Sequence, residues 1–453
     1  MNNWISMELG QIASIFNGST PSTNNEDYWN GDIIWITPKD LSDQNQKYIL
    51  KGERTITQKA LSNTKLLPEG TVLLSSRAPI GLLSIASTKL VTNQGFKNIV
   101  VNTDILHNEF LYYYLKLKKN ELNNLGSGTT FKEISKSTLE KYKIKLPDLP
   151  TQKSIAKVLS DLDAKIELNN RINRELEAMA KTLYDYWFVQ FDFPFDFAQD
   201  KPNEQGKPYK SSGGKMVYNK ELKREIPEGW EVYFLSSILK HNYSSISKNE
   251  SFHKIEYLDT SSLTKNIIEE TQSLNLTNDK IPSRARRVVE MNDILYSTVR
   301  PNLCHYGLIK HPKKNMIAST GFVQLSSKKD WISNDLIYTH LTSSWVSVRL
   351  HQIAALSVSA YPSISPNDIL ELNIALPKKD KNLEFINSYL DTIYSKISLN
   401  QNENQQLSSL RDWLLPMLMN GQVTVRQAHG NAVKEAEESL SMAAEPSVEY
   451  KKG

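Results

Sequence analysis

The sequence has few of the residues and motifs on which common enzyme classes depend. Its only cysteine is Cys304, which excludes a disulfide framework and a zinc site built from cysteines, and which suits a reducing compartment. No glycine-rich phosphate loop ends in Lys-Ser or Lys-Thr, and there is no His-Glu-x-x-His or Gly-x-Ser-x-Gly motif. The eight histidines are scattered along the chain. We therefore expect no catalytic residue, metal site or cofactor-binding site on this chain, and a cytoplasmic location.

Long apolar runs and a strong net charge are also missing. The longest apolar stretch, residues 73–85, is interrupted by Arg77 and Pro79, so we expect no membrane span. The first residues lack a basic segment followed by an apolar one, which argues against a signal peptide. With 54 basic and 50 acidic residues, the net charge is only +4. Such a charge permits nucleic-acid binding through local patches but does not require it.

The sequence does contain a long internal repeat. A segment from about residue 4 to residue 188 recurs, in diverged form, from residue 230 to residue 419. The clearest match joins residues 165–170 (KIELNN) with residues 396–401 (KISLNQ). Because there are only two long units, the pattern indicates a tandem duplication rather than a solenoid.

Each copy has the pattern of a mixed α/β module followed by a long helix. Short apolar or alternating runs, separated by glycine and proline, predict strands in both modules. We expect an α+β fold in which two tandem α/β modules are separated by a pair of long antiparallel coiled-coil helices, with approximate two-fold symmetry. The expected boundaries are 1–150 for the first module, 151–190 for its helix, 191–228 for a linker, 229–378 for the second module, 379–420 for its helix and 421–453 for a disordered or frayed tail.

Both helical segments carry a heptad pattern. Apolar residues recur at alternating spacings of four and three positions, beginning at Ile155 in the first segment and at Ile386 in the second. A seam of that length on both segments predicts a coiled coil. At 1.5 Å per residue, helices of about 35 residues would each be roughly 50 Å long.

Four asparagines interrupt the two seams near their midpoints: Asn169, Asn173, Asn400 and Asn404. If the helices pair, these amides meet and can pair with one another, and buried asparagines at seam positions set the register. Parallel and antiparallel pairing would both align them. The duplication favours antiparallel pairing, because a module precedes each helix. The alternative is that these asparagines are tolerated polar substitutions.

The modules also carry donor-rich side chains in predicted loops, and both have a slight excess of basic residues. Arginine can hold guanine, and asparagine or glutamine can hold adenine, with about 1–3 kcal/mol of discrimination per pair. Lysine, serine and threonine more often hold phosphates. The candidate DNA contacts are Lys39, Arg77, Asn93, Gln94, Lys97, Thr129, Thr130, Lys132, Arg284, Arg286, Arg287, Arg300, Asn302, Ser359 and Tyr361. For most of them a solvated surface role is the alternative. We favour Arg77 and Arg300, which the alignment places at equivalent positions after apolar strands.

A nuclease pattern has to be weighed against this interpretation. Asp148, Asp163 and Lys165 fit the spacing of a Pro-Asp…Asp-x-Lys motif, in which two carboxylates hold Mg²⁺ and a lysine stabilises charge. However, Asp163 and Lys165 fall on the predicted coiled-coil helix, and the second copy has Pro377-Lys378 in place of Pro147-Asp148. A stand-alone Mg²⁺-dependent nuclease is therefore the alternative, and a coiled-coil scaffold without DNA function is a third interpretation.

Taken together, the chain resembles the specificity subunit of a type I restriction–modification system over residues 1–420. The segments that carry the resemblance are 126–131 (GSGTTF), 144–147 (IKLP), 151–169 (TQKSIAKVLSDLDAKIELN), 184–188 (YDYWF), 207–215 (KPYKSSGGK) and 226–230 (IPEGW). Residues 195–200 look like an insertion, and the tail after Val423 has no counterpart in this pattern.

The resemblance implies a role in phage defence without catalysis by this chain. The two modules would be target-recognition domains that each read one half of a split sequence in double-stranded DNA. The helices would act as a ruler and would dock two methyltransferase subunits, which methylate adenine N6 after flipping the base. Restriction and translocase subunits would join them. S-adenosylmethionine, ATP and Mg²⁺ are expected on the partner subunits, with none on this chain and no membrane partner.

Overall fold

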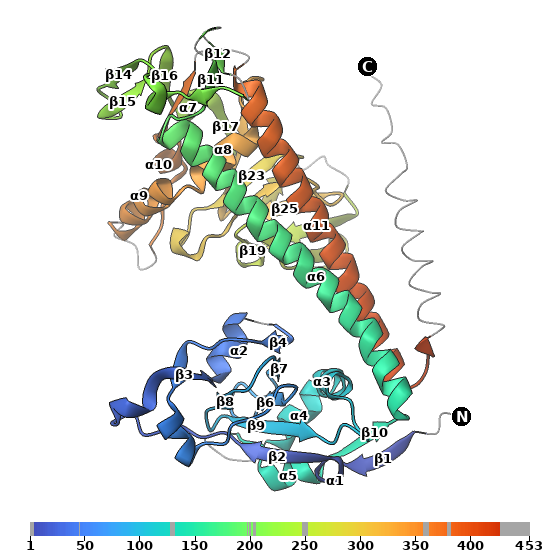
Figure 1. Ribbon diagram of the computed structural model, residues 1–453. Coiled ribbons are helices and arrows are strands. Elements are labelled where there is room, and N and C mark those ends of the chain that lie inside the picture. The colour runs from blue at the N-terminus through green and yellow to red at the C-terminus, as the bar shows by residue number, and fades with distance from the viewer. Residues whose placement is uncertain are drawn as a thin grey trace. The chain divides into compact units, whose positions relative to one another are not determined.

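The computed structural model describes residues 4–44, 46–126, 132–196, 198, 201–202, 205–246, 252–356, 362–377 and 382–425. The chain forms two compact units, of which unit 1 is Met1–Glu167 with Asn404–Gly453 and unit 2 is Leu168–Glu403. The two long helices, α6 (Leu149–Tyr184) and α11 (Asn382–Met419), are each divided between these units (Figure 1).

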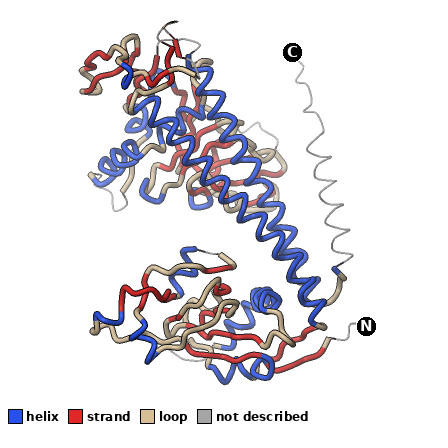
Figure 2. Tube along the Cα trace, in the orientation of Figure 1, coloured by secondary structure: helices blue, strands red, loops and turns tan. Residues whose placement is uncertain are grey.

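Unit 1 holds the first module, with helices and strands in mixed order (Figure 2). Its elements are β1 (Ile5–Glu8), α1 (Leu9–Ile12), β2 (Ala13–Asn17), β3 (Trp29–Ile36), α2 (Pro38–Gln44), β4 (Tyr48–Ile49), β5 (Arg54–Ile56), β6 (Val72–Ser75), β7 (Leu83–Ala86), β8 (Val91–Thr92), β9 (Phe96–Val101), α3 (Asn108–Leu117), α4 (Lys119–Leu125), α5 (Lys136–Glu140), β10 (Lys143–Leu146), the first half of α6 and the second half of α11.

The central sheet of unit 1 has the strand order β2-β9-β6-β7-β4. All four residues of β6 are buried, which fits its apolar sequence and its position between two neighbours. A second sheet has the order β5-β3-β8, and β1 pairs with β10. Ile155 and Leu159 of α6, and Leu414 and Leu418 of α11, belong to the same buried cluster as the sheet residues. The helix pair is therefore part of the core of unit 1.

Unit 2 holds the linker and the second module. Its elements are the second half of α6, β11 (Pro194–Asp196), β12 (Lys201–Pro202), β13 (Lys207–Pro208), β14 (Met216–Asn219), β15 (Arg224–Pro227), β16 (Trp230–Phe234), α7 (Leu235–Ile238), β17 (Leu239–His241), β18 (Lys254–Leu258), β19 (Leu263–Thr264), β20 (Ile267–Ile268), β21 (Gln272–Asn275), β22 (Ala285–Val288), β23 (Asp293–Ser297), β24 (Tyr306–Ile309), β25 (Met316–Ser319), β26 (Phe322–Ser327), α8 (Asn334–Leu341), α9 (Ser344–Ala355), α10 (Pro366–Leu370), β27 (Asn373–Pro377) and the first half of α11.

The sheets of unit 2 repeat those of unit 1. The order β17-β26-β23-β24 matches β2-β9-β6-β7, and the pair β16–β27 matches β1–β10. Strand β18 pairs antiparallel with β21 and parallel with β25, as β3 does with β5 and β8. The copies differ at two sheet edges. In unit 1, β4 extends the central sheet, and in unit 2, β22 extends the sheet that contains β18. The duplication in the sequence is therefore a duplication of the fold.

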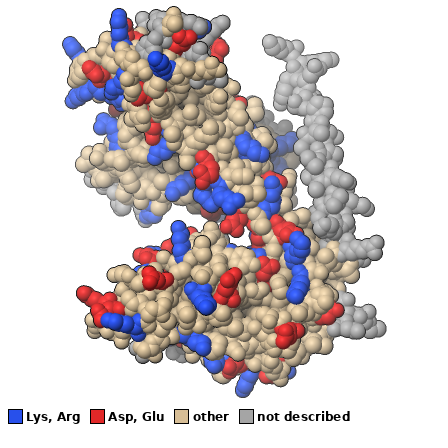
Figure 3. Space-filling view, in the orientation of Figure 1, with Lys and Arg blue, Asp and Glu red and all other residues tan. Residues whose placement is uncertain are grey.

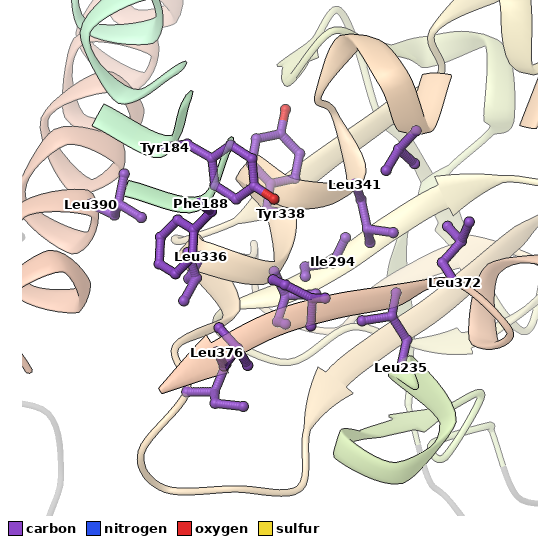
Figure 4. Close-up of a cluster of buried hydrophobic side chains, with 14 of the residues drawn as sticks. Tyr184, Phe188, Leu235, Ile294, Leu336, Tyr338, Leu341, Leu372, Leu376 and Leu390 are labelled. Atoms are coloured by element: carbon purple, nitrogen blue, oxygen red, sulfur yellow. The ribbon is translucent and has the colours of Figure 1, made fainter. Parts of the chain in front are cut away.

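The core of unit 2 gathers side chains from both long helices and the sheet. Figure 4 shows Tyr184 and Phe188 from the end of the first helical segment, Leu390 from α11 and Tyr338 from α8 lying together. The linker adds a cluster of aromatic rings, in which Phe193 stacks on Tyr209 with ring centroids 4.8 Å apart. The linker is therefore packed into unit 2 at this cluster.

The two long helices run antiparallel within each unit. In unit 2, Asn400 Nδ2 donates to Asn173 Oδ1 at 2.8 Å, and Asn169 Nδ2 donates to Glu403 Oε2 at 2.7 Å. Residue numbers rise along one helix as they fall along the other, so the predicted direction and the overall fold class are confirmed. The expected pairing of amides is confirmed for Asn173 with Asn400, whereas the sequence did not identify Glu403 as a partner of Asn169.

Some expectations cannot be compared with the structure. The expected tail lies outside the described residues from 426 onward, as do residues 197, 199 and 200 of the suspected insertion. Among the described residues, no helix has both the length and the apolar character that a membrane crossing requires.

Candidate nucleic-acid interface

Arg77 lies directly beyond β6 in a small ionic cluster. The Ser76 carbonyl accepts from the Ile134 amide at 3.0 Å, and this contact sets Arg77 opposite Glu133. Arg77 Nε is 2.9 Å from Glu133 Oε2, and Lys97 Nζ is 2.9 Å from Glu133 Oε1. The Arg77 side chain is 48% exposed and that of Lys97 only 5%. Glu133 therefore joins one accessible cation to one buried cation.

The charges of this cluster favour an ionised carboxylate. Burial alone would raise the pKa of Glu133, but hydrogen bonds from Lys97 and Arg77 outweigh it and lower that pKa. Lys97 Nζ also lies 3.4 Å from Ser76 Oγ. Lys97 was predicted to contact DNA, but its ammonium lies behind Arg77, where it supports Glu133. Sequence reasoning missed Glu133 because it considered only donors and basic residues.

Asn93 and Gln94 occupy a tight turn beside this cluster. Asn93 Oδ1 accepts from the Gly95 amide at 2.9 Å, so this side chain stabilises its own turn. Gln94 is exposed, and its Oε1 accepts a hydrogen bond from the Thr20 hydroxyl. A Cβ at Gly18 would lie only 1.8 Å from the Asn93 carbonyl oxygen, so glycine is required for the two loops to approach. Of the two predicted contacts, Gln94 is the accessible one.

The remaining candidates of the first module are more scattered. Lys39, on α2, forms an exposed ion pair with Glu53 at 3.0 Å. Lys132 is exposed next to Glu133. Thr129 and Thr130 lie outside the described residues. The structure thus places Arg77, Gln94 and Lys132 on exposed loops at the strand ends, whereas Lys39 pairs with an acidic neighbour.

The three arginines around β22 differ in accessibility. Arg284 and Arg286 are exposed, and the Arg284 carbonyl accepts from the Thr320 amide at 2.8 Å. Arg287 is half-buried, and burial lowers the pKa of its guanidinium. Its Nε is buried without a hydrogen-bond partner in the described part of the chain. The predicted basic cluster is therefore reduced to two freely accessible arginines.

The predicted equivalence of Arg77 and Arg300 is wrong by one residue. Thr298 accepts from Ile364 at 2.9 Å, just as Ser76 accepts from Ile134, and the following residue Val299 lies opposite Ser363. Val299 is thus the counterpart of Arg77. The number of residues that separates equivalent positions in the two copies is different for the helices and for the strands. A comparison of the sequences without strand pairs therefore cannot assign equivalent residues one by one.

Arg300 itself has a left-handed backbone with φ of 48°. Its amide donates to the Pro362 carbonyl at 2.8 Å. Asn302 is exposed within a short 3₁₀ turn, Pro301–Leu303. Ser359 and Tyr361 fall outside the described ranges. Arg300 and Asn302 therefore lie in an exposed loop whose conformation differs from that around Arg77.

A lysine joins the first module to its long helix. Lys47 Nζ lies 2.8 Å from Glu109 Oε1, at the start of α3, and 2.7 Å from Ser160 Oγ on α6. Ser160 in turn donates to Glu109 Oε2 at 2.8 Å. Burial would raise the pKa of Glu109, but hydrogen bonds from Lys47 and Tyr48 lower it. These contacts hold the module sheet, α3 and α6 together.

The second module has the same type of contact at equivalent helix positions. Lys310 Nζ lies 2.6 Å from Asp335 Oδ1, at the start of α8, and 2.8 Å from Asp391 Oδ1 on α11. Lys310 and Asp335 are almost completely buried. Burial raises the pKa of Asp335 although Lys310 opposes that shift. We name the two sets of contacts the Lys47 clasp and the Lys310 clasp.

The nuclease residues do not form one site. Asp148 Oδ1 accepts from the Thr151 amide at 2.9 Å at the start of α6. Asp163 accepts from Arg411 Nη1 at 2.7 Å and from the Tyr113 hydroxyl at 2.6 Å. The two carboxylates are separated along the helix by about 22 Å at 1.5 Å per residue, which is too far for one metal ion. Among the described residues, no group of His, Cys, Asp and Glu side chains is placed to hold a metal.

The visible surface carries mixed charge. Figure 3 shows Lys and Arg interspersed with Asp and Glu on the visible face of each unit. Neither unit presents a face of one sign in that view. On that face, a contact with DNA would therefore depend on particular side chains rather than on a broad field.

Comparisons with known proteins agree with the repeated fold. The family model of the type I restriction modification DNA specificity domain matches residues 1–178 and 227–409. The type I restriction enzyme MjaIX specificity subunit of Methanocaldococcus jannaschii is 32% identical over 439 residues, which cover 94% of each chain. The HindI specificity subunit of Haemophilus influenzae is 23% identical over 74% of this chain and 81% of its own length. The crystal structure of the type I S subunit from M. genitalium has a TM-score of 0.58 at 16% identity, covering 92% of this chain and 96% of that one.

Proposed function

This chain belongs to the family of type I restriction–modification DNA specificity subunits, and on that premise we propose that its two modules read the two halves of a bipartite DNA target. It is a DNA-recognition subunit and not an enzyme. The observation that carries the proposal is a contrast between the copies. The strand orders of the two copies match apart from one added strand in each, whereas Arg77 and Glu133 at the strand ends of the first module are replaced by Val299 and Ser363 in the second.

This contrast favours two different half-sites over one repeated half-site. Sequence is read by side chains that reach base edges, and a fold on its own carries no base preference. Two copies of one fold with different side chains at the same place are suited to two different base sequences. The two clasps hold helix and module together within each unit, and the Asn173–Asn400 pair joins the two long helices in unit 2, which favours a fixed gap between the half-sites.

We further propose that the long helices dock two methyltransferase subunits. Large apolar side chains lie exposed on their surfaces within unit 2, including Met179 at 49%, Tyr389 at 41% and Leu399 at 53%. Large apolar side chains that are left exposed on a helix surface can form part of a protein interface. Because the chain is duplicated, it offers two related docking faces to two copies of one partner.

The partners would supply the chemistry. In this proposal S-adenosylmethionine binds the methyltransferase subunits, and ATP and Mg²⁺ serve the restriction subunits that join them. The DNA is double-stranded, and the whole complex acts in the cytoplasm. The role of this chain is to place the methyltransferases over adenines in each half-site.

Sequencing of methylated DNA tests the proposal. Cells that express this chain with its methyltransferase partner should carry N6-methyladenine within a motif of two defined parts and a gap of fixed length. A continuous motif would contradict the two-module reading. In a second experiment, the purified chain is incubated with plasmid and Mg²⁺. Cleavage without partner subunits would support the nuclease alternative.

A further inference from the structure

We propose that Arg77 reads a guanine in the half-site of the first module, and that Glu133 and Lys97 are the positioning residues that hold its guanidinium for this contact. This inference rests on the proposed function, because it assigns a base to one side chain of a module that reads DNA. It also goes further, because it separates Arg77 from the other exposed cations of the chain.

The orientation of the Arg77 guanidinium is the first support. Its Nε donates to Glu133 Oε2 at 2.9 Å. The two terminal nitrogens have no hydrogen-bond partner among the described residues. Guanine presents two acceptors, O6 and N7, on its major-groove edge, and a guanidinium can meet both with two parallel donors. The two terminal nitrogens of Arg77 are therefore available to donate to O6 and N7 of guanine.

The fixed position of Glu133 is the second support. Its other carboxylate oxygen is held by Lys97, which is 5% exposed and also contacts Ser76. The backbone of Ser76 is tied to Ile134, so the two chain segments that carry Arg77 and Glu133 cannot separate without breaking hydrogen bonds. An arginine held in this way loses less side-chain entropy on binding than a free one.

The chemistry of the cluster favours a base over a phosphate. A phosphate contact needs only a positive charge, and a neighbouring carboxylate weakens it by repulsion. A guanine edge carries no net charge, so Glu133 repels it less than it would repel a phosphate while it orients Arg77. The lowered pKa of Glu133 keeps its carboxylate ionised at neutral pH.

The second module lacks this device. Strand pairing places Val323 at the position of Lys97. Leu74 of β6 lies opposite Lys97, and its counterpart in β23, Tyr296, lies opposite Val323. Val299 and Ser363 replace Arg77 and Glu133. A guanine contact of this kind is therefore confined to the first half-site.

The test measures binding of the complex of this chain with its methyltransferase partner to a set of duplexes. Each duplex differs from the target found by methylation sequencing at one base pair. The wild-type complex should lose about 5- to 150-fold in affinity when one G·C pair of one half-site is replaced. Arg77→Lys should weaken that preference, because lysine lacks the planar pair of donors that matches O6 and N7, and it should leave every position of the other half-site unchanged. Binding to DNA of unrelated sequence should also be retained, because lysine keeps the charge.

Two further variants sharpen the result. Glu133→Gln keeps an acceptor for Arg77 Nε, so it should weaken discrimination at the same base pair by less than Arg77→Lys does. Arg349→Lys, at an exposed position of α9, is the matched control and should change no position. The inference is overturned if Arg77→Lys preserves discrimination at all positions, or if it weakens binding equally to every duplex. If the wild-type complex itself shows no two-part preference, the proposed function has failed instead.

Discussion

The contacts between module and helix are alike in the two halves of the chain, whereas the strand ends are not. In both halves, a lysine lies between an acidic residue at the start of a module helix and a polar residue on the long helix. At the strand ends, a cluster of three charged residues in the first module is replaced by two valines and a serine in the second. The contacts that the two copies share maintain the architecture, and the side chains that differ between the copies are free to distinguish bases.

The two clasps are nevertheless built from different lysines. Lys47 precedes β4 in the first module, and Lys310 follows β24 in the second. Their acidic partners Glu109 and Asp335 occupy equivalent positions in α3 and α8. The acidic residue at this helix position is thus paired with a lysine from a different part of the module in each copy.

The largest expected effect comes from breaking the Lys310 clasp. Lys310→Met leaves Asp335 buried without its cation, and losing one partner of a buried pair costs about 3–5 kcal/mol. Lys47→Met should cost less, because Glu109 is 18% exposed and keeps hydrogen bonds from Tyr48 and Ser160. Urea unfolding of the two variants measures the difference. Equal losses would mean that the two clasps are energetically the same despite their different burial.

A smaller effect is expected at the asparagine pair between the helices. Asn173→Leu leaves the buried Asn400 amide without its partner, which should cost about 1–3 kcal/mol. The double substitution Asn173→Leu with Asn400→Leu should recover most of that loss, because no unpaired amide remains. A double-mutant cycle measured by chemical unfolding gives the coupling. Additive losses would show that the two amides do not depend on each other.

The smallest expected effect is a difference between the two units in how their stability changes at low pH. In unit 1 the pKa values of Glu109 and Glu133 are lowered by hydrogen bonds from cations. Such groups add stability above their unfolded pKa and lose it as the pH falls through the folded pKa. In unit 2 burial raises the pKa values of Asp293 and Asp335. These groups favour the folded state at low pH and oppose it as the pH rises from the unfolded pKa to the folded one.

Lowering the pH from about 5 to about 3 should therefore weaken unit 1 through Glu109 and Glu133. His340 of unit 2 opposes this contrast, because burial lowers its pKa to about 3 and the unfolded chain takes up that proton at higher pH, so the comparison is made in the His340→Gln variant. Hydrogen exchange of that variant followed by mass spectrometry should show protection lost first in the first module. Glu256 of unit 2 has a lowered pKa and works against this difference, so Glu256→Gln should enlarge it. Protection lost first in unit 2 would contradict the assignment of these carboxyl groups.

The sequence predicted the repeated architecture well, because periodic features are local. The heptads from Ile155 and Ile386 predicted two helices, and Asn173 and Asn400 predicted their register. The sheet order within each module required contacts between distant strands, which a single sequence does not contain.

The interface was harder to predict for the same reason. Arg77, Lys97 and Glu133 come from three separate segments, and only the fold brings them together. The charge of Lys97 predicts a contact with DNA, but its ammonium is buried and supports Glu133. The alignment of Arg77 with Arg300 failed because strand register, rather than local similarity, decides which residues are equivalent.

The most direct test of two independent modules is a chain in which residues 229–378 are replaced by residues 1–150. Co-expressed with the methyltransferase partner, this chain would carry the first module on both helices. Sequencing of methylated DNA should then reveal a palindromic motif made of two inverted copies of the first half-site, with the original gap. An unchanged motif, or a motif unrelated to the first half-site, would contradict the account.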